Sequence, residues 1–251
     1  MLRVDGFHVA RGILNPGLLQ QISEEIDRHP RLIEVLGSSR NARDPYLRSF
    51  DRVMNLWRTV RPIAELIYSR ELTRPSIDLL GCSRLRLSHD QCLYKLPHGD
   101  PTPIHADQYH WPVSSEKTLT AWIPLQPTPK EMGPVRFYKG SHLIDEAQRC
   151  ALHESQQEAI DAFFLKGPFP LIEPEFALGD VSFHYGWTFH SAGANQSDEI
   201  RKVVTIVYME DGIRLAKMRP EQHEKMLISW CPGRSFGDLL DSPNNPLVAA
   251  I

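Results

Sequence analysis

The sequence predicts a mainly β fold with flanking helices, built as a sandwich or a barrel. From about residue 80 onward, short apolar or alternating runs are separated by Gly, Pro, Asp and Asn. Before that point, apolar residues recur at helical spacing instead. We therefore expect helices in the first third of the chain and strands after it. The predicted strands cover residues 83–87, 91–96, 119–125, 135–138, 181–185 and 203–209.

Two helices are predicted in the N-terminal third. Asn15 followed by Pro16 is typical of a helix start, with an N-cap and a proline in the first turn. This helix should end near residue 30, and its apolar face should consist of Leu18, Leu19, Ile22 and Ile26. The second helix is expected from about residue 53 to 69, with a buried stripe of Trp57, Val60, Ala64 and Ile67. We expect both helices to brace the outside of a sheet.

A polar, helix-prone segment at about 146–165 interrupts the predicted strands. It is interpreted as an insertion over the mouth of the barrel. Segments with a 3.6-residue period between strands are usually packed surface helices, and a mobile substrate lid is the alternative. The sequence leaves both interpretations open.

Length and composition fit a single enzyme domain. The 251 residues can form one jelly-roll domain, with N-terminal helices at about 15–70, a core at about 80–210 and a C-terminal tail. Hydrophobic residues make up 41% and charged residues 24%, which excludes a disordered chain. The net charge of -3 offers no basic footprint, so no nucleic-acid partner is expected.

Cysteine usage and the N-terminus predict a cytoplasmic protein. The first residues lack the apolar stretch of a signal peptide, and no run of 18 apolar residues could span a bilayer. No membrane partner is therefore expected. No cysteine pair has CxxC spacing, so buried reduced thiols are favoured over disulfides or zinc ligands, as in a reducing compartment: Cys82, Cys92, Cys150 and Cys231.

Four residues have the chemistry of a metal site beside a carboxylate-binding site. His105 and Asp107 are at i and i+2, so on a strand both side chains point to one face, whereas a helix would splay them. His190 supplies a second imidazole from elsewhere in the chain. Two imidazoles and one carboxylate can hold Fe(II) on one face of its octahedron and leave other positions open. Arg201, 11 residues after His190, carries a permanently charged fork that suits a carboxylate.

The blocks around these residues occur in a characteristic order. They read QCLYKLP at 91–97, HADQYHWP at 105–112, TAWIPL at 120–125, GPVRF at 133–137, KGSH at 139–142, GDV at 179–181, HSAGAN at 190–195 and RK at 201–202. This order resembles the phytanoyl-CoA dioxygenase family of Fe(II)/2-oxoglutarate oxygenases, from about residue 5 to about residue 246. The resemblance implies a double-stranded β-helix core, also called jelly-roll or cupin-like. One departure is Ala192, where the family often has a polar residue.

The resemblance also implies the co-substrates and their contacts. Fe(II) would be held by His105, Asp107 and His190, and 2-oxoglutarate would place its distal carboxylate on Arg201. Trp122 and Gln91 fall where related enzymes place neighbours of the co-substrate. With O2 as the second co-substrate, the enzyme would release succinate and CO2 while it hydroxylates, or otherwise oxidises at a C–H bond, a small organic metabolite. Halogenation is disfavoured, because Asp107 holds the coordination position that such halogenases open to halide.

Candidate substrate contacts are close in sequence to the predicted ligands. These aromatic or polar residues are His110, Trp111, Tyr185 and Trp187. They could form a pocket with an apolar body and polar tips, and core packing is the alternative. Such a pocket suggests a small or medium organic substrate rather than a macromolecule. No basic cluster that would suit the phosphates of CoA is evident.

Two other classes of protein compete with the oxygenase. A cupin-like metal-dependent isomerase or hydrolase would share the fold, but it would usually complete the first motif with another His or Glu. Arg201 would then have no role. A non-catalytic binding module would need no ligand set. Several further histidines are expected to be core or surface residues: His8, His29, His89, His153 and His223.

Overall fold

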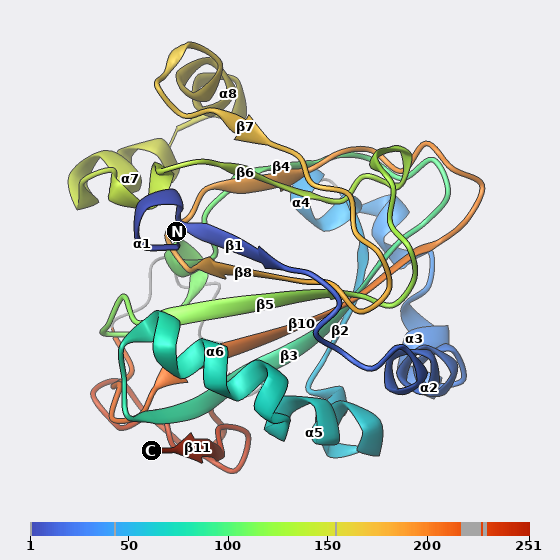
Figure 1. The fold of residues 1–251 in the computed structure, drawn as a ribbon. Coiled ribbons are helices and arrows are strands. Elements are labelled where there is room, and N and C mark those ends of the chain that lie inside the picture. The colour runs from blue at the N-terminus through green and yellow to red at the C-terminus, as the bar shows by residue number, and fades with distance from the viewer. Residues whose placement is uncertain (1, 43, 154, 217–226, 228–229) are drawn as a thin grey trace.

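The computed structural model describes residues 2–42, 44–153, 155–216, 227 and 230–251. Two antiparallel sheets lie face to face (Figure 1). The larger sheet has the order β1-β8-β5-β10-β3-β11, with β2 also paired to β3, and the smaller has the order β4-β9-β6-β7. The strands are β1 Phe7–Ala10, β2 Asp51–Met54, β3 Arg84–Lys95, β4 Thr102–His105, β5 Thr118–Pro124, β6 Val135–Tyr138, β7 Leu171–Ile172, β8 Val181–Tyr185, β9 His190–Ala192, β10 Arg201–Glu210 and β11 Leu247–Ala250.

Alternation along the strands gives the larger sheet two different faces. On β5, Leu119, Ala121 and Ile123 belong to the core under the helices. Thr120 and Trp122 point the other way and line a cavity between the two sheets. Strands β3, β8 and β10 alternate in the same sense, so one face of the sheet stabilises the fold and the other can present polar side chains to the cavity.

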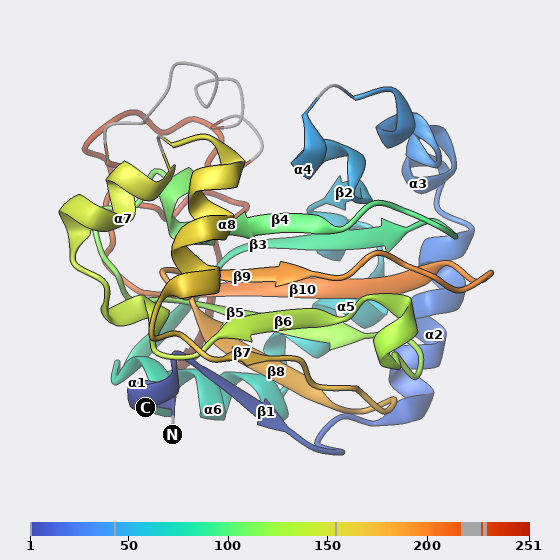
Figure 2. The same ribbon diagram turned by 90° about the horizontal axis from the view of Figure 1, so that it is seen from above.

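The outer face of the larger sheet is covered by α2 (Pro16–Asp27), α5 (Arg61–Tyr68) and α6 (Arg70–Leu80) (Figures 1 and 2). The first predicted helix is confirmed by α2. The Asn15 side chain accepts hydrogen bonds from the backbone amides of Gly17 at 2.8 Å and Leu18 at 3.4 Å. These amides have no partner within the helix, so the cap defines where it begins. The residues of α2 that are buried in the core are Leu19, Ile22 and Ile26.

The second predicted helix was partly wrong. Residues 51–54 form β2, a 3-10 turn η2 (Leu56–Arg58) follows, and only α5 is helical in the predicted range. Val53 belongs to a strand that alternates between buried and half-buried residues, a period of two that a helix cannot match. Asn55 then adopts a left-handed conformation with φ of 56°, which breaks the chain direction before the helix. The prediction also missed α6, which contains Pro75.

Most predicted strands are confirmed, and some are longer than expected. The ranges 135–138 and 181–185 match β6 and β8, and 119–125 and 203–209 overlap β5 and β10 closely. The two runs at 83–87 and 91–96 join into the single strand β3, which contains a β-bulge opposite Val207 and Tyr208 of β10. The short elements not yet placed are α1 Leu2–Asp5, α3 Pro30–Val35, α4 Pro45–Arg48, η1 Ser38–Asn41, η3 Asp107–His110, η4 Lys130–Met132 and η5 Ser141–Leu143.

The polar segment at 146–165 forms α7 (Glu146–His153) and α8 (Gln157–Lys166). Its predicted position over the barrel mouth was wrong, because α8 lies across the outer face of the smaller sheet (Figure 2). Ile160 and Phe164 pack against Tyr138 and other outward-facing residues of that sheet. Of the described residues of α7 and α8, none lines the cavity. The packed-helix interpretation therefore describes α8.

The predicted mainly β fold with flanking helices is confirmed by these two antiparallel sheets and their helical cover. Cys82, Cys92 and Cys231 are buried thiols outside any disulfide. Across the part of the chain that the structure describes, no helix has the length and hydropathy needed to cross a membrane.

Candidate metal centre

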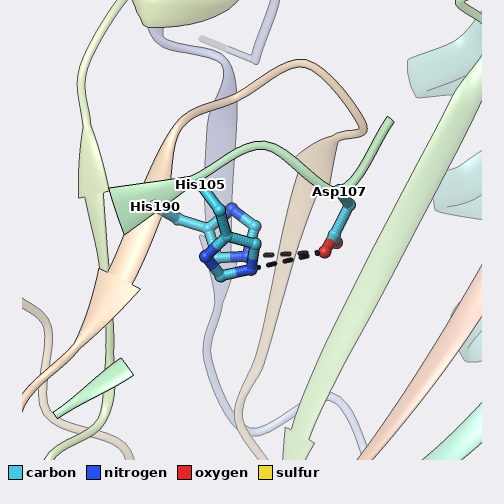
Figure 3. Close-up of side chains that lie close together, drawn as sticks. All are labelled: His105, Asp107 and His190. Carbon is cyan, nitrogen blue, oxygen red and sulfur yellow. Dashed lines mark ion pairs between the residues drawn. The ribbon is translucent and has the colours of Figure 1, made fainter. Parts of the chain in front are cut away.

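The three predicted metal ligands meet between the sheets (Figure 3). His105 ends β4 and His190 begins β9, and the two residues are directly opposite in the antiparallel register. Asp107 lies just beyond the strand in η3, but Ala106 is extended, so the carboxylate still points to the same side as His105. The ligand atoms of the three residues all lie within 4.8 Å of one another. The Nε2 atoms of His105 and His190 are 3.6 Å and 3.8 Å from Asp107 Oδ1.

Both imidazoles are held in the orientation that a metal requires. His105 Nδ1 donates to the carbonyl of Pro103 at 2.8 Å, and His190 Nδ1 donates to the carbonyl of Thr188 at 2.9 Å. A carbonyl oxygen can only accept, so each Nδ1 carries the proton and each Nε2 presents a lone pair toward Asp107. Hydrogen bonds of this kind fix the tautomer and the ring plane of histidine ligands in metal sites.

Asp107 is ionised and oriented by its neighbours. Burial favours the neutral acid, but the imidazoles of His190, His105 and His184 outweigh it and hold the pKa of Asp107 well below its ordinary value. Thr120 Oγ1 donates to Oδ2 at 3.2 Å, and His184 Nε2 lies 3.5 Å from the same oxygen. Oδ2 therefore contacts Thr120 and His184 of the larger sheet, while Oδ1 is directed toward the two ligand histidines.

This donor set fits a divalent transition metal. One carboxylate and two neutral imidazoles converge from one side, as in the facial triads of non-haem Fe(II) oxygenases. Burial and the nearby His105 lower the pKa of His190 well below its ordinary value, so His190 keeps a free lone pair at neutral pH. His105, Asp107 and His190 are thus the residues that would hold the metal.

Arg201 presents a buried cation to the same cavity. Its side chain is almost fully buried, and Nη1 donates to the carbonyl of Gly133 at 2.6 Å. Burial lowers the pKa of Arg201 to about 10, so it remains charged at neutral pH. No carboxylate of the described residues pairs with it, and Nε has no hydrogen-bond partner among them. A buried guanidinium with unused donors is a site for a carboxylate ligand.

The two predicted co-substrate neighbours line the same cavity as Arg201. Gln91 on β3, Thr205 on β10 and Trp122 on β5 form one row across three neighbouring strands, and all three line the cavity. The Arg201 guanidinium carbon lies 5.8 Å from the centre of the Trp122 ring. The structure therefore brings Gln91, Trp122 and Arg201 to the cavity that contains the candidate metal ligands.

Two further features surround the Arg201 end of the cavity. Lys95 is opposite Arg201 in the strand register and is fully buried, with Nζ 2.7 Å from the carbonyl of Gly193 and 3.3 Å from Thr102 Oγ1. Burial, reinforced by the charge of Arg201, holds the pKa of Lys95 well below its ordinary value. Ala192 lines the cavity directly opposite Thr102 of the neighbouring strand β4. The Thr102 side chain therefore brings a hydroxyl to the region where Ala192 has none.

The predicted substrate residues separate into two pairs. His110 stacks on Tyr46 at 6.3 Å between ring centres, and Tyr46 packs edge-on against His105 at 4.8 Å. Trp111 packs edge-on against His89 at 5.7 Å, and His89 Nε2 is hydrogen-bonded to Gln91 Nε2 at 2.8 Å. His110 therefore lies next to the cavity residue Tyr46, whereas Trp111 is one residue further out, against His89.

The second pair is directed away from the cavity. Tyr185 follows His184 on β8 and points to the opposite face, where its hydroxyl donates to the carbonyl of Leu79 at 3.0 Å. Trp187 packs in the cluster outside the smaller sheet, where Arg149 of α7 lies 4.3 Å from its ring centre. Both residues are near the ligands in sequence but not in space, so the structure does not support them as substrate contacts.

Several cavity residues were missed by the sequence analysis. Tyr46, Phe50 and His184 line the cavity, and His89 lies beside it. Alternation along β8 could have found His184, since its neighbours Phe183 and Tyr185 face the helices. Of the other histidines, His29 caps α3 through the Arg31 amide, whereas His223 and the His153 side chain lie outside the described residues.

A His-Asp-His cluster between two facing antiparallel sheets defines the class, a cupin-like protein with a double-stranded β-helix core. Within this class the chain belongs to the phytanoyl-CoA dioxygenase family, whose profile matches residues 2–203. Both the predicted family and the predicted fold class are therefore confirmed.

The chain is similar to a probable alpha-ketoglutarate-dependent hypophosphite dioxygenase from Stutzerimonas stutzeri, at 27% identity over 159 residues. That match covers 58% of this chain and 52% of the relative, so the chain spans about half the length of that curated relative. Among solved structures, the epimerase SnoN in complex with Fe3+, alpha ketoglutarate and nogalamycin RO has a TM-score of 0.79 at 26% identity, covering 99% of this chain and 96% of SnoN. The alpha ketoglutarate-dependent carbocyclase SnoK has a TM-score of 0.81 at 24% identity, with 99% and 94% covered.

Proposed function

We propose that this protein is a non-haem Fe(II)/2-oxoglutarate dioxygenase that oxidises a C–H bond of a small organic metabolite and releases succinate and CO2. One observation carries the proposal: a convergent His-Asp-His set shares one cavity with a buried arginine that has no carboxylate partner among the described residues. The family and the SnoN complex, which contains iron and alpha ketoglutarate, support the same activity.

Each residue has a defined task in this proposal. His105, Asp107 and His190 hold the metal, and the carbonyls of Pro103 and Thr188 keep both imidazoles in the metal-binding tautomer. Bound iron would supply the activation of dioxygen, coupled to the decarboxylation of 2-oxoglutarate.

Arg201 orients the co-substrate. A forked pair between its buried guanidinium and the distal carboxylate would fix both the position and the angle of 2-oxoglutarate. Trp122 forms one wall beside this pair, and Gln91 adds an amide that His89 holds in place. Because Arg201 and the three candidate ligands line one cavity, a co-substrate held at Arg201 would have its other end toward the metal.

The binding of Fe(II) and 2-oxoglutarate can be tested without knowledge of the substrate. Anaerobic addition of both to the purified protein should give a weak visible charge-transfer band. His190→Ala should lose the band together with bound iron. Lys202→Ala is the matched control and should keep it, because the Lys202 ammonium points to the outer side of the sheet, 2.5 Å from Asp27 Oδ2. A wild-type protein that binds iron but shows no band with 2-oxoglutarate would contradict the proposal.

The same measurement separates the oxygenase from a cupin-like isomerase or hydrolase, which would bind metal but give no such band. Arg201 favours the oxygenase, because an isomerase or hydrolase leaves its buried charge without a carboxylate. Asp107 likewise disfavours halogenation, since its carboxylate occupies the position that halide would need.

We further propose that residues 1–251 work as one oxygenase domain in the cytoplasm on a small-molecule substrate, and not on nucleic acid or at a membrane. The support is that strands from both halves of the chain line a single cavity. The buried thiols of Cys82, Cys92 and Cys231 fit a reducing compartment.

A further inference from the structure

On the side of the larger sheet that faces the cavity, one arginine side chain has no hydrogen-bond or ion-pair partner among the described residues. Arg52 on β2 is directly opposite Leu93 of β3, and Leu93 lines the cavity. Its neighbours on β2 face the other way: Val53 packs in the core under the helices, and Asp51 accepts backbone amide hydrogen bonds on that side. Alternation along β2 therefore directs Arg52 toward the same side as Leu93.

The Arg52 side chain has no hydrogen bond or ion pair among the residues that the structure describes, and it is half-buried. Arg48, four residues earlier in the chain, is paired with Asp100. A guanidinium carries five N–H donors and keeps its charge at every physiological pH. On a cavity-facing strand, these unused donors are available to a bound anion.

Arg52 acts on the residues around the metal centre. The positive charge of Arg52 acts to lower the pKa of Tyr46 and the pKa of His89. The Tyr46 ring packs on His105, and His89 is hydrogen-bonded to Gln91. Burial lowers the pKa of the His89 imidazole to about 3, and the Arg52 charge acts in the same direction. His89 is therefore neutral and does not compete with Arg52 for an anion.

Two groups of aromatic rings lie next to residues of the metal centre and its cavity. Tyr46, which packs on His105, stacks with His110 at 6.3 Å between ring centres. His89, which is hydrogen-bonded to the cavity residue Gln91, packs edge-on against Trp111 and stacks on Trp230 at 5.6 Å. Flat, largely apolar walls of this kind hold a carbon skeleton but leave a charged end without a partner.

We propose that the substrate of this enzyme is an organic oxyanion whose carboxylate or phosphonate binds Arg52, while its carbon skeleton lies between Tyr46 and Trp111 and reaches the metal centre. This inference rests on the proposed function and adds the substrate class to it. In this proposal the anionic group of the substrate forms a forked, charge-assisted hydrogen-bonded contact with Arg52. Its carbon skeleton contacts the rings of Tyr46 and Trp111.

The test measures the binding of small probes to the protein loaded anaerobically with Fe(II) and 2-oxoglutarate, by titration calorimetry. The probes are 3-phenylpropionate and phenylphosphonate, each compared with a neutral counterpart of similar shape, 3-phenylpropionamide and dimethyl phenylphosphonate. At least one anion should bind about 10-fold or more tightly than its counterpart, the size of a charge-assisted hydrogen bond. The anion that shows the preference identifies carboxylate or phosphonate as the preferred group.

Three variants test whether Arg52 is the residue that causes the preference for the anion over its neutral counterpart. Arg52→Gln should bind anion and neutral counterpart equally, and Arg52→Lys should keep part of the preference because it keeps the charge but not the fork. Arg61→Gln is the control and should match the wild type, since Arg61 is 88% exposed on α5 and pairs with Glu65. A preference that persists in Arg52→Gln, equal binding in the wild type, or no binding of either anion overturns the inference.

The charge-transfer band recorded before the probes are added keeps the two proposals separate. If the band is missing from the wild type, the proposed function fails. If the band is present in both wild type and Arg52→Gln but no anion is preferred, only the substrate class fails. The band also shows that Arg52→Gln retains a folded metal centre.

Discussion

A buried guanidinium is costly unless a carboxylate meets it, and this makes Arg201 the most informative single residue for the co-substrate. Its one hydrogen bond to the Gly133 carbonyl leaves Nε without a partner among the described residues. The buried side chain of Lys95 lies next to it, and the Arg201 charge, together with burial, disfavours the charged form of Lys95. A carboxylate bound at Arg201 would supply the counter-charge that this end of the cavity lacks among the described residues.

Replacement of Arg201 by Ala should raise the 2-oxoglutarate concentration needed for half-maximal charge-transfer absorbance by about 100-fold or more, because breaking a buried ion pair costs roughly 3–5 kcal/mol. Arg201→Lys should also be impaired, since an ammonium cannot form the fork. Titration of the anaerobic Fe(II) protein measures the effect, with Lys202→Ala as the control. If the Arg201→Ala titration is unchanged and Lys95→Ala is impaired instead, the carboxylate site belongs to Lys95.

A variant of Asp107 can test whether this residue coordinates the metal or only balances its charge from nearby. Asp107→Glu keeps the charge but adds one methylene, while metal sites tolerate only about 0.2 Å in ligand distance. Iron content and succinate release should therefore both fall strongly in Asp107→Glu. Asp211→Glu is a matched control, since Asp211 pairs with Arg84 and Arg86 far along β3 from the metal centre. Wild-type iron content and turnover in Asp107→Glu would remove Asp107 from the set of ligands.

At the residue scale, the cluster could be predicted where spacing carries the information. His105 and Asp107 are two residues apart on an extended chain, so their common direction follows from backbone geometry. Tyr185 was predicted from its closeness in sequence to His190, whereas alternation along β8 points its side chain to the face opposite His184. Tyr46 carries no such signal, because only the long-range packing of α4 brings it to the cavity.

At the element scale, η2 depends on one buried carboxylate. Asp90 on β3 accepts the Leu56 amide at Oδ1 and the Trp57 amide at Oδ2, at 3.0 Å and 3.4 Å. This contact holds residues 56 and 57 in a 3-10 turn, so the helix that we predicted from residue 53 does not form there. A local sequence pattern cannot show the contact, because Asp90 is far along the chain. Proline in the first turn of α5 then defines the true start. The confirmed α2, in contrast, depends on the adjacent Asn15, which is visible in the sequence.

The burial of Asp90 predicts a pH dependence of stability. Burial raises the pKa of Asp90 to about 7, although the Trp57 and Leu56 amides oppose it. Because the unfolded chain releases this proton at lower pH than the folded protein, this group's contribution to stability falls as pH rises from about 4 to about 7. Asp90→Asn cannot ionise but still offers an acceptor, so its stability relative to the wild type should rise over that window. Urea unfolding of the apoproteins at pH 4.5 and 7.5 measures this, and an unchanged difference would mean that Asp90 is ionised throughout.

At the scale of the whole molecule, the two sheets contribute different parts of the site. The strands β4 and β9 of the smaller sheet carry His105 and His190, whereas Arg201, Trp122 and Gln91 come from the larger sheet. A co-substrate that bridges the metal and Arg201 would therefore connect the two sheets. Fold-level reasoning could predict that the strands face each other, but only the register shows that His105 and His190 are exact partners across β4 and β9.

Because the two sheets contribute different parts of the site, we expect metal and 2-oxoglutarate to raise the melting temperature in two separate steps. A ligand at 100 times its Kd stabilises the folded state by about 2.7 kcal/mol, which raises the Tm of a protein of this size by about 5 to 10 °C. Mn(II), used as a stable substitute for Fe(II), should give one such increase, and 2-oxoglutarate should give a second only when metal is present. Arg201→Ala should keep the metal step and lose most of the second, whereas His190→Ala should lose both. Differential scanning calorimetry of the three proteins measures the steps, and a 2-oxoglutarate step that survives in His190→Ala would show that the co-substrate binds away from the metal centre.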